Sequence, residues 1–115
     1  GVVVGGNYSQ ERATGANAAV TSDGGVTWTL VPAAGVGGFR SAVAWLPSVR
    51  GWLTVGPAGA DRTGEDALLW RAAGGEGYDA VSLHAASGTG WATGSGGRIA
   101  RVTVTVDGRA NPAVE

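Results

Sequence analysis

The chain contains no cysteine, no methionine and no lysine among its 115 residues. The absence of cysteine excludes disulfides, thiol catalysis and zinc sites built from cysteine. Histidine occurs once, as His84. A single imidazole does not supply the ligands of a metal site, so we expect neither a metal nor another cofactor.

Long apolar runs and helical periodicity are also missing. No run approaches the roughly 18 residues that a membrane-spanning helix needs. No glycine-free stretch repeats apolar residues at positions i, i+3, i+4 and i+7. Eight arginines balance nine carboxylates without forming a basic stripe. Neither a membrane span nor a nucleic-acid partner is expected.

Glycine, valine and tryptophan dominate what is present. There are 22 glycines and five tryptophans, and valine outnumbers leucine, which favours strands because β-branched side chains suit a pleated sheet. Short apolar runs alternate with glycine-rich turns, a pattern that predicts an all-β fold. The expected strands are residues 2–5, 17–22, 27–31, 39–46, 52–56, 67–71, 78–84, 91–93 and 98–106.

The composition also bears on the source of the chain. Abundant alanine, glycine and arginine without lysine indicate a GC-rich coding sequence, and hence a bacterium. The absence of cysteine fits an exported protein, so we expect an extracytoplasmic location, periplasmic or secreted. The start at Gly1, inside a valine run and without methionine, predicts a fragment or a trimmed product.

Aromatic landmarks recur at intervals of about 40 residues, which is typical of a repeat architecture. Gly38-Phe39 matches Gly77-Tyr78, and Gly51-Trp52 matches Gly90-Trp91 at the same spacing. These pairs predict that Phe39 and Tyr78 occupy equivalent core positions, and likewise the two tryptophans. A propeller, in which each blade is one four-stranded unit of about this length, explains such a repeat better than a sandwich.

A third landmark is the segment Thr21-Ser22-Asp23-Gly24-Gly25-Val26-Thr27-Trp28. An aspartate at a hairpin tip can accept hydrogen bonds from the turn, and glycine supplies the positive φ that the turn needs. The tryptophan would then enter the outer strand and bury its ring against the neighbouring blade. The segment resembles the Asp box, S/T-x-D-x-G-x-T-W, of BNR-repeat propellers. The matching positions are Thr21, Asp23, Gly25, Thr27 and Trp28.

Weaker copies of this segment follow at intervals of about 42 residues. The second copy keeps Thr63, Glu65 and Trp70, and the third keeps Thr105 and Asp107. In addition, the pattern Gly-Trp-x-x-Gly followed by residues 96–101 resembles the inner-to-middle strand run of the photosystem II assembly-factor-like propellers, many of which are labelled sialidase-like. The resemblance therefore implies a partial β-propeller of two to three four-stranded antiparallel blades joined by Asp-box hairpins.

The blades are expected at residues 1–31 (partial), 39–72 (complete) and 78–114, in the last of which Pro112 disrupts the final strand. Propellers close with about four to eight blades, so further blades or oligomerisation would be needed for closure. Arg40 and Asp79 begin the first strands of two blades and are predicted near one channel mouth, where ligands bind. Trp45 has no repeat counterpart and is the candidate exposed aromatic.

Three functional hypotheses follow from these observations. Similarity to sialidases would imply an arginine triad, a tyrosine nucleophile paired with glutamate and an acid/base aspartate, and none of these can be matched to a residue here. The leading hypothesis is a non-catalytic binding and assembly scaffold for a protein partner. Two alternatives stay open: a fragment of a sialidase-like glycoside hydrolase, and an oligomerising propeller lectin that binds carbohydrate.

Overall fold

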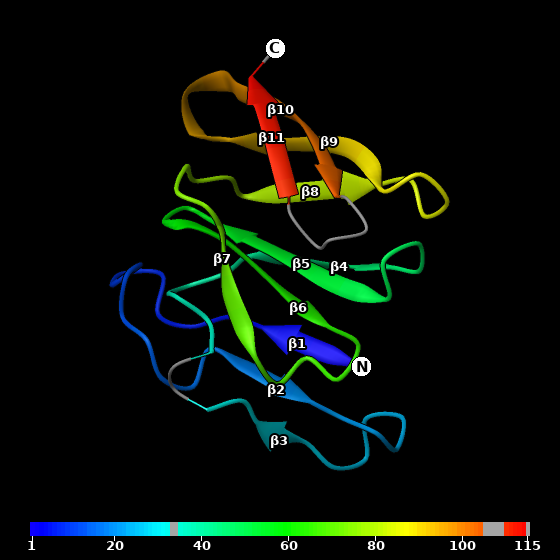
Figure 1. Ribbon diagram of the computed structural model, residues 1–115. Coiled ribbons are helices and arrows are strands. Elements are labelled where there is room, and N and C mark those ends of the chain that lie inside the picture. Colours follow the sequence, from blue (N-terminus) through cyan, green and yellow to red (C-terminus); the bar gives the residue numbers. More distant parts are fainter. Residues whose placement is uncertain (33–34, 105–109, 115) are drawn as a thin grey trace.

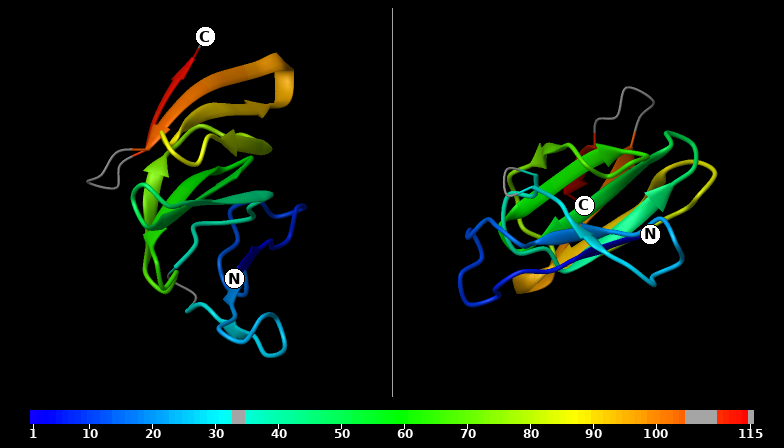
Figure 2. Two further views of the ribbon diagram at one scale, coloured as in Figure 1. Left: turned by 90° about the vertical axis from the view of Figure 1, so that its right-hand side faces the viewer. Right: turned by 90° about the horizontal axis from the view of Figure 1, so that it is seen from below.

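The computed structural model describes residues 1–32, 35–104 and 110–114, in which strands form three antiparallel sheets and no α-helix occurs. The sheets stack face to face, with the first at one end of the molecule and the third at the other (Figures 1 and 2). The expectation of an all-β fold is therefore confirmed. The arrangement is an open stack of sheets without a closed ring.

Each sheet is built from strands that follow one another in the chain. The first contains, in spatial order, β1 (Val2–Val4), β2 (Ala18–Val20) and β3 (Thr29–Leu30). The second contains β4 (Ala42–Leu46), β5 (Gly51–Gly56), β6 (Gly59–Gly64) and β7 (Trp70–Gly74). The third contains β8 (Ala80–Leu83), β9 (Thr89–Gly94), β10 (Arg98–Val104) and β11 (Ala110–Val114), with the short 3-10 turn η1 (Ser95–Gly97) between β9 and β10.

Three strand predictions need correction. The sequence did not predict β6, because Gly-Ala-Asp-Arg-Thr-Gly lacks alternating apolar residues; it pairs with β5 and β7, and its Asp61 is buried in an ion pair. β7 begins later than expected, since Ala67 has a left-handed φ of 59° and belongs to the preceding turn. β11 forms despite Pro112, because it is an edge strand, where a missing N–H is tolerated.

Two apolar clusters hold the sheets together. Between the first and second sheets lie Ala18, Val31, Val36, Ala67 and Trp70, all buried. Between the second and third sheets, Leu46, Leu53 and Val55 pack against Tyr78, Ala92, Ala100, Val102 and Val104. Side chains on a strand alternate between its two faces, so the second sheet is covered on both sides whereas the outer sheets are covered on one.

The same backbone hydrogen bond joins each sheet to the one before it. Arg40 N–H donates to the carbonyl of Gly5 at 3.0 Å, and Tyr78 N–H donates to the carbonyl of Gly56 at 2.9 Å. In each case the donor leads into the first strand of one sheet and the acceptor closes a strand of the preceding sheet. Arg40 and Tyr78 are therefore equivalent, and the predicted pairing of Phe39 with Tyr78 is off by one residue.

This one-residue shift changes the faces on which the repeated tryptophans lie. Trp52 packs against the cluster between the first and second sheets. Trp91 neighbours the buried Ala92 and points the other way, so that it lies on the outer side of the third sheet and is exposed. The predicted equivalence of Trp52 and Trp91 is therefore wrong.

Trp28 and Trp70, in contrast, sit in equivalent turns. Each indole N–H donates to the carbonyl three residues earlier, from Trp28 to Gly25 at 3.0 Å and from Trp70 to Ala67 at 2.8 Å. Trp70 is 7 % exposed because Val31 and Val36 cover it, but Trp28 is 46 % exposed. The expectation that Trp28 is buried is wrong, since none of the sheets that the structure describes lies on that side of it.

This difference in burial predicts different costs for the same substitution. Trp70→Ala should reduce the free energy of unfolding by about 3–5 kcal/mol, as expected for loss of a buried indole. Trp28→Ala, at an equivalent turn but half-exposed, should cost about 1 kcal/mol. Urea unfolding followed by far-UV circular dichroism measures both. Equal losses would contradict the assignment of Trp28 to an uncovered face.

Candidate functional site

The turn between β2 and β3 is fixed by the carboxylate of Asp23. Its Oδ1 accepts hydrogen bonds from the Thr21 hydroxyl at 2.8 Å and from Thr27 N–H at 2.9 Å. Its Oδ2 accepts from the Thr27 hydroxyl. Gly25, with a φ of 94°, donates its N–H to the Thr21 hydroxyl oxygen at 3.0 Å. These contacts stabilise the ionised carboxylate, with Thr27 contributing most, and hold the pKa of Asp23 well below its usual range.

The turn between β6 and β7 does not reproduce this network. Thr63 is buried and donates its hydroxyl to the carbonyl of Leu69 at 2.6 Å. Glu65 forms an exposed ion pair with Arg50, and the neighbouring Asp66 accepts the Leu68 N–H at 3.1 Å. The prediction that Glu65 replaces Asp23 is therefore wrong, because the following residue provides the turn carboxylate. Thr105 and Asp107 lie outside the described residues.

Arg40 does not face an open channel mouth. It is buried, and its Nε and Nη2 both lie 2.8 Å from Oδ2 of Asp61. Gly37 N–H donates to the same oxygen at 3.1 Å. Asp79 is exposed in the bend that precedes β8, where its carbonyl accepts the Ser41 hydroxyl at 2.6 Å. The prediction that Arg40 contacts a ligand is corrected: its guanidinium is committed to Asp61.

Trp45 pairs with Trp52 across β4 and β5. The two ring centroids are 5.0 Å apart with a tilt of 53°, and Trp45 is 37 % exposed. Trp52 also lines a groove of about 310 Å³ between the β2–β3 and β6–β7 turns, together with Thr21, Thr27 and Glu65. Thr21 and Thr27 bind Asp23, and Glu65 binds Arg50. The groove therefore offers a polar surface whose side chains are largely engaged with one another.

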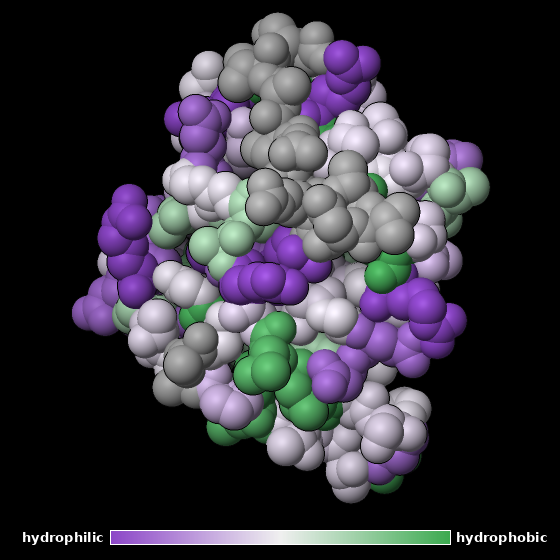
Figure 3. All heavy atoms as spheres, viewed as in Figure 1, coloured by the Kyte–Doolittle hydropathy of each residue, from purple (hydrophilic) through white to green (hydrophobic). Residues whose placement is uncertain are grey.

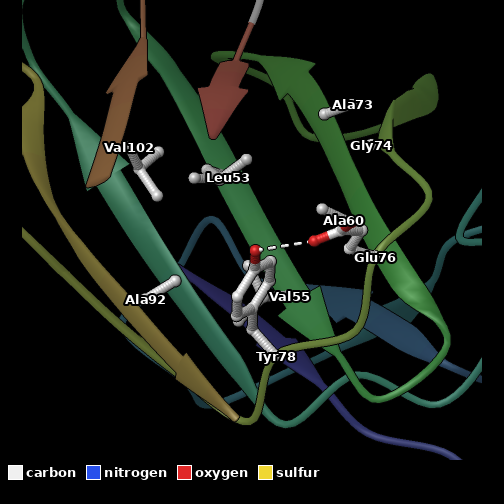
Figure 4. A pocket seen from close by; sticks show the side chains of 9 residues that line it. All are labelled: Leu53, Val55, Ala60, Ala73, Gly74, Glu76, Tyr78, Ala92 and Val102. Atoms are coloured by element: carbon white, nitrogen blue, oxygen red, sulfur yellow. Dashed lines mark hydrogen bonds between the residues drawn. The ribbon is translucent and has the colours of Figure 1, made fainter. Parts of the chain in front are cut away.

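A tyrosine and a glutamate meet beside the second apolar cluster. Tyr78 is 3 % exposed, and its hydroxyl donates to Oε2 of Glu76 at 3.1 Å (Figure 4). Burial raises the pKa of Tyr78, and the Glu76 carboxylate raises it further, although nearby Arg98 acts in the opposite direction. A nucleophilic phenol needs a lowered pKa. The pair therefore suits a structural role better than a catalytic one.

The cavity beside Tyr78 is too small for a substrate. It measures about 20 Å³, and Leu53, Val55, Ala92 and Val102 are among its lining residues (Figure 4). That volume is sufficient for about one water molecule. The space is a packing gap between the second and third sheets.

The two ends of the stack expose apolar side chains whose exposure the sequence analysis did not predict. The outer side of the first sheet, here called the first end face, carries Val3, Trp28 and Leu30. The outer side of the third sheet, the second end face, carries Trp91 and Ile99, which point away from the buried Ala92 and Ala100. The alternation of side chains between the two faces of β1, β9 and β10 could have indicated these exposed residues, but only if the register of each strand in its sheet had been known.

Other site types find little support. In the part of the chain that the structure describes, no three histidine, aspartate or glutamate side chains gather to hold a metal ion. Within the same residues, no helix has the length and hydropathy to cross a membrane. Comparison with protein-family models, with curated proteins and with solved structures finds no match.

The buried ion pair predicts a non-additive stability effect. Arg40→Met and Asp61→Val should each reduce the free energy of unfolding by about 3–5 kcal/mol, because each leaves a buried charge without its partner. The double variant should lose much less than the sum. Chemical unfolding of the four proteins measures the coupling. Additive losses would show that the two side chains do not depend on each other.

The lowered pKa of Asp23 predicts a pH-dependent contribution to stability. A carboxylate with a lowered folded-state pKa stabilises the fold above the unfolded pKa of about 4, and this contribution declines as the pH falls below that value. Asp23→Asn should therefore unfold at a lower temperature than wild type at pH 7, and the difference should shrink toward pH 3. Thermal melts at both pH values, with Asp79→Asn as the control, test this. A pH-independent difference would contradict it.

Proposed function

We propose that this chain is a segment of a BNR-type β-propeller that acts as a non-catalytic binding and assembly scaffold. The repeated junction supports this proposal most strongly: Arg40 N–H binds the carbonyl of Gly5, and Tyr78 N–H binds that of Gly56. Successive sheets related by the same step are what consecutive propeller blades require. The equivalent turns at Trp28 and Trp70 add a second, independent correspondence.

The polar chemistry of the chain favours a scaffold over an enzyme. Asp23 binds two threonines, Arg40 binds Asp61, and Tyr78 binds Glu76. Each of these groups fixes the fold and is engaged within it. Exposed apolar side chains occur at the two end faces and in the turn before β7, where Leu68 and Leu69 are exposed. Figure 3 shows a hydrophobic patch on the face that it draws. Apolar patches of this kind favour a protein partner.

The lectin alternative receives less support from the tryptophans. Trp28 lies on one end face and Trp91 on the other, at positions that are not equivalent in their sheets. A repeating set of sugar platforms would place aromatic rings at matching positions. From the cysteine-free, lysine-free composition, we place the scaffold outside the cytoplasm of a bacterium.

Assays for glycoside hydrolysis test the non-catalytic assignment. The purified chain should not hydrolyse fluorogenic glycosides, sialosides included, above the rate of a buffer blank, because the Tyr78 phenol is buried and held protonated. Tyr78→Phe is the control variant. Turnover by wild type that Tyr78→Phe abolishes would overturn the scaffold assignment and restore the glycoside hydrolase alternative.

A further inference from the structure

The connection between β1 and β2 is much longer than its counterparts in the other two sheets. The turn at Trp28 matches the turn at Trp70, so the β1–β2 connection corresponds to the one between β5 and β6. That connection has two residues, between Gly56 and Gly59, and the corresponding connection in the third sheet is the three-residue η1. In the first sheet the same connection comprises the 13 residues 5–17, here called the β1–β2 loop.

Long connections in a repeat architecture indicate where function has been added to the scaffold. The three corresponding connections lie on one side of the stack, where the β1–β2 loop projects at the left of Figure 1. Insertions into repeats collect on one face, which is often the binding face. A loop of this length that contains no strand or helix is uncommon in a compact fold unless it is functional. Because the additional residues lie between two paired strands, their number is independent of what precedes β1 or follows β11.

The backbone of the β1–β2 loop is held in place along its length. The Oδ1 of Asn7 accepts the backbone N–H two residues later at 2.9 Å. The buried Asn17 donates its Nδ2 to the carbonyl of Ala13 at 2.9 Å. At the junction of the first two sheets, Phe39 N–H donates to the carbonyl of Glu11 at 2.8 Å. A loop that is ordered in advance loses less conformational entropy when it binds a partner.

The side chains at the tip of this loop are exposed and make few contacts. Residues 7–12 form an unbroken exposed run, in which Tyr8 is 77 % exposed. With the rest of the described chain, the side chains of Tyr8, Glu11 and Arg12 form no hydrogen bond or ion pair. Binding loops combine a fixed backbone with such side chains, and tyrosine and arginine are the residues that contribute most to contact energy.

We propose that the β1–β2 loop is the surface through which this chain binds a protein partner. The inference rests on the proposed scaffold function and names the surface that this function uses. Tyr8 supplies an aromatic anchor, Arg12 a partner for a carboxylate, and Glu11 a partner for a basic group on the bound protein.

The chemistry of the loop favours a protein over other ligands. Nucleic acid is bound by cations, and here the carboxylate of Glu11 lies beside the one cation, Arg12. Residues 8–13 line an open hollow of about 540 Å³, and all of its lining residues belong to this loop. A small-molecule site encloses most of its ligand, whereas a hollow on one loop accommodates a group that projects from a partner's surface.

Site-specific photo-crosslinking tests the proposal in the cells that produce the chain. p-Benzoylphenylalanine at position 8 should give a discrete protein adduct. The same group in place of Leu69, which is 84 % exposed in the β6–β7 turn, should give about ten-fold less or none. The exchange of charges Glu11→Arg with Arg12→Glu keeps composition and net charge, and it should lower the yield at position 8 by about ten-fold. Equal yields at the two positions, or a yield that the exchange does not change, would overturn the proposal.

The crosslinked protein is then identified by mass spectrometry and purified for binding measurements. Tyr8→Ala should raise its Kd for the chain by about ten-fold or more, whereas Leu69→Ala should leave the Kd unchanged. An adduct that nuclease or glycosidase digests and protease does not would overturn the assignment of a protein partner.

Circular dichroism of each variant separates misfolding from loss of contact. If the chain with p-benzoylphenylalanine at position 8 does not fold, position 12 takes its place with the same control. No adduct from a folded chain would overturn the loop as a binding surface and leave the non-catalytic assignment standing. Glycoside turnover would overturn that assignment without bearing on the adduct.

Discussion

The sheets of this chain are too narrow to hold cores of their own, so the fold depends on the junctions between them. A sheet of three or four short strands buries apolar area when another sheet covers it, and here two junctions supply nearly all of the buried side chains. Each junction combines an apolar cluster with one backbone hydrogen bond, made by Arg40 or Tyr78. Because the junctions repeat, a side chain that is buried in a junction, such as Trp70, has an exposed equivalent, Trp28, on the outer side of the first sheet.

The two residues that make these hydrogen bonds have different side chains, although the backbone contact between the sheets is the same. Arg40 and Tyr78 are equivalent, yet one requires the carboxylate of Asp61 and the other a hydrogen bond to Glu76. Asp61 is available because β6 crosses the sheet beside Arg40, whereas Ala92 and Ala100 leave room for the ring of Tyr78. Different side chains thus fill one position, and each brings its own partner, since a buried polar group without one is costly.

The sequence allowed the strand-rich fold and the approximate repeat to be predicted, but not the register. Gly51-Trp52 and Gly90-Trp91 look alike as letters, and pairing them moves every side chain of β9 to the wrong face. The backbone equivalence of Arg40 with Tyr78 depends on hydrogen bonds between sheets, which no local pattern encodes. The prediction that Trp28 is buried failed for another reason. Burial at this position requires a sheet on the outer side of the tryptophan, and such a sheet covers the equivalent Trp70 but not Trp28.

The prediction for Arg40 failed because a charged side chain was assumed to be free to bind a ligand. Arg40 was expected to face a ligand because it begins a strand, but a buried guanidinium among Gly37, Gly38 and Gly59 has room to reach Asp61 instead. Asp23, by contrast, was predicted to accept hydrogen bonds from its turn, and its oxygens accept them from Thr21 and Thr27. Arg40, Asp61 and Asp23 are thus committed to the fold, whereas the end faces carry exposed apolar side chains. The first of these belongs to the sheet that, in the described part of the chain, has three strands and the least internal pairing, so its stability depends most on the junction that covers its inner side.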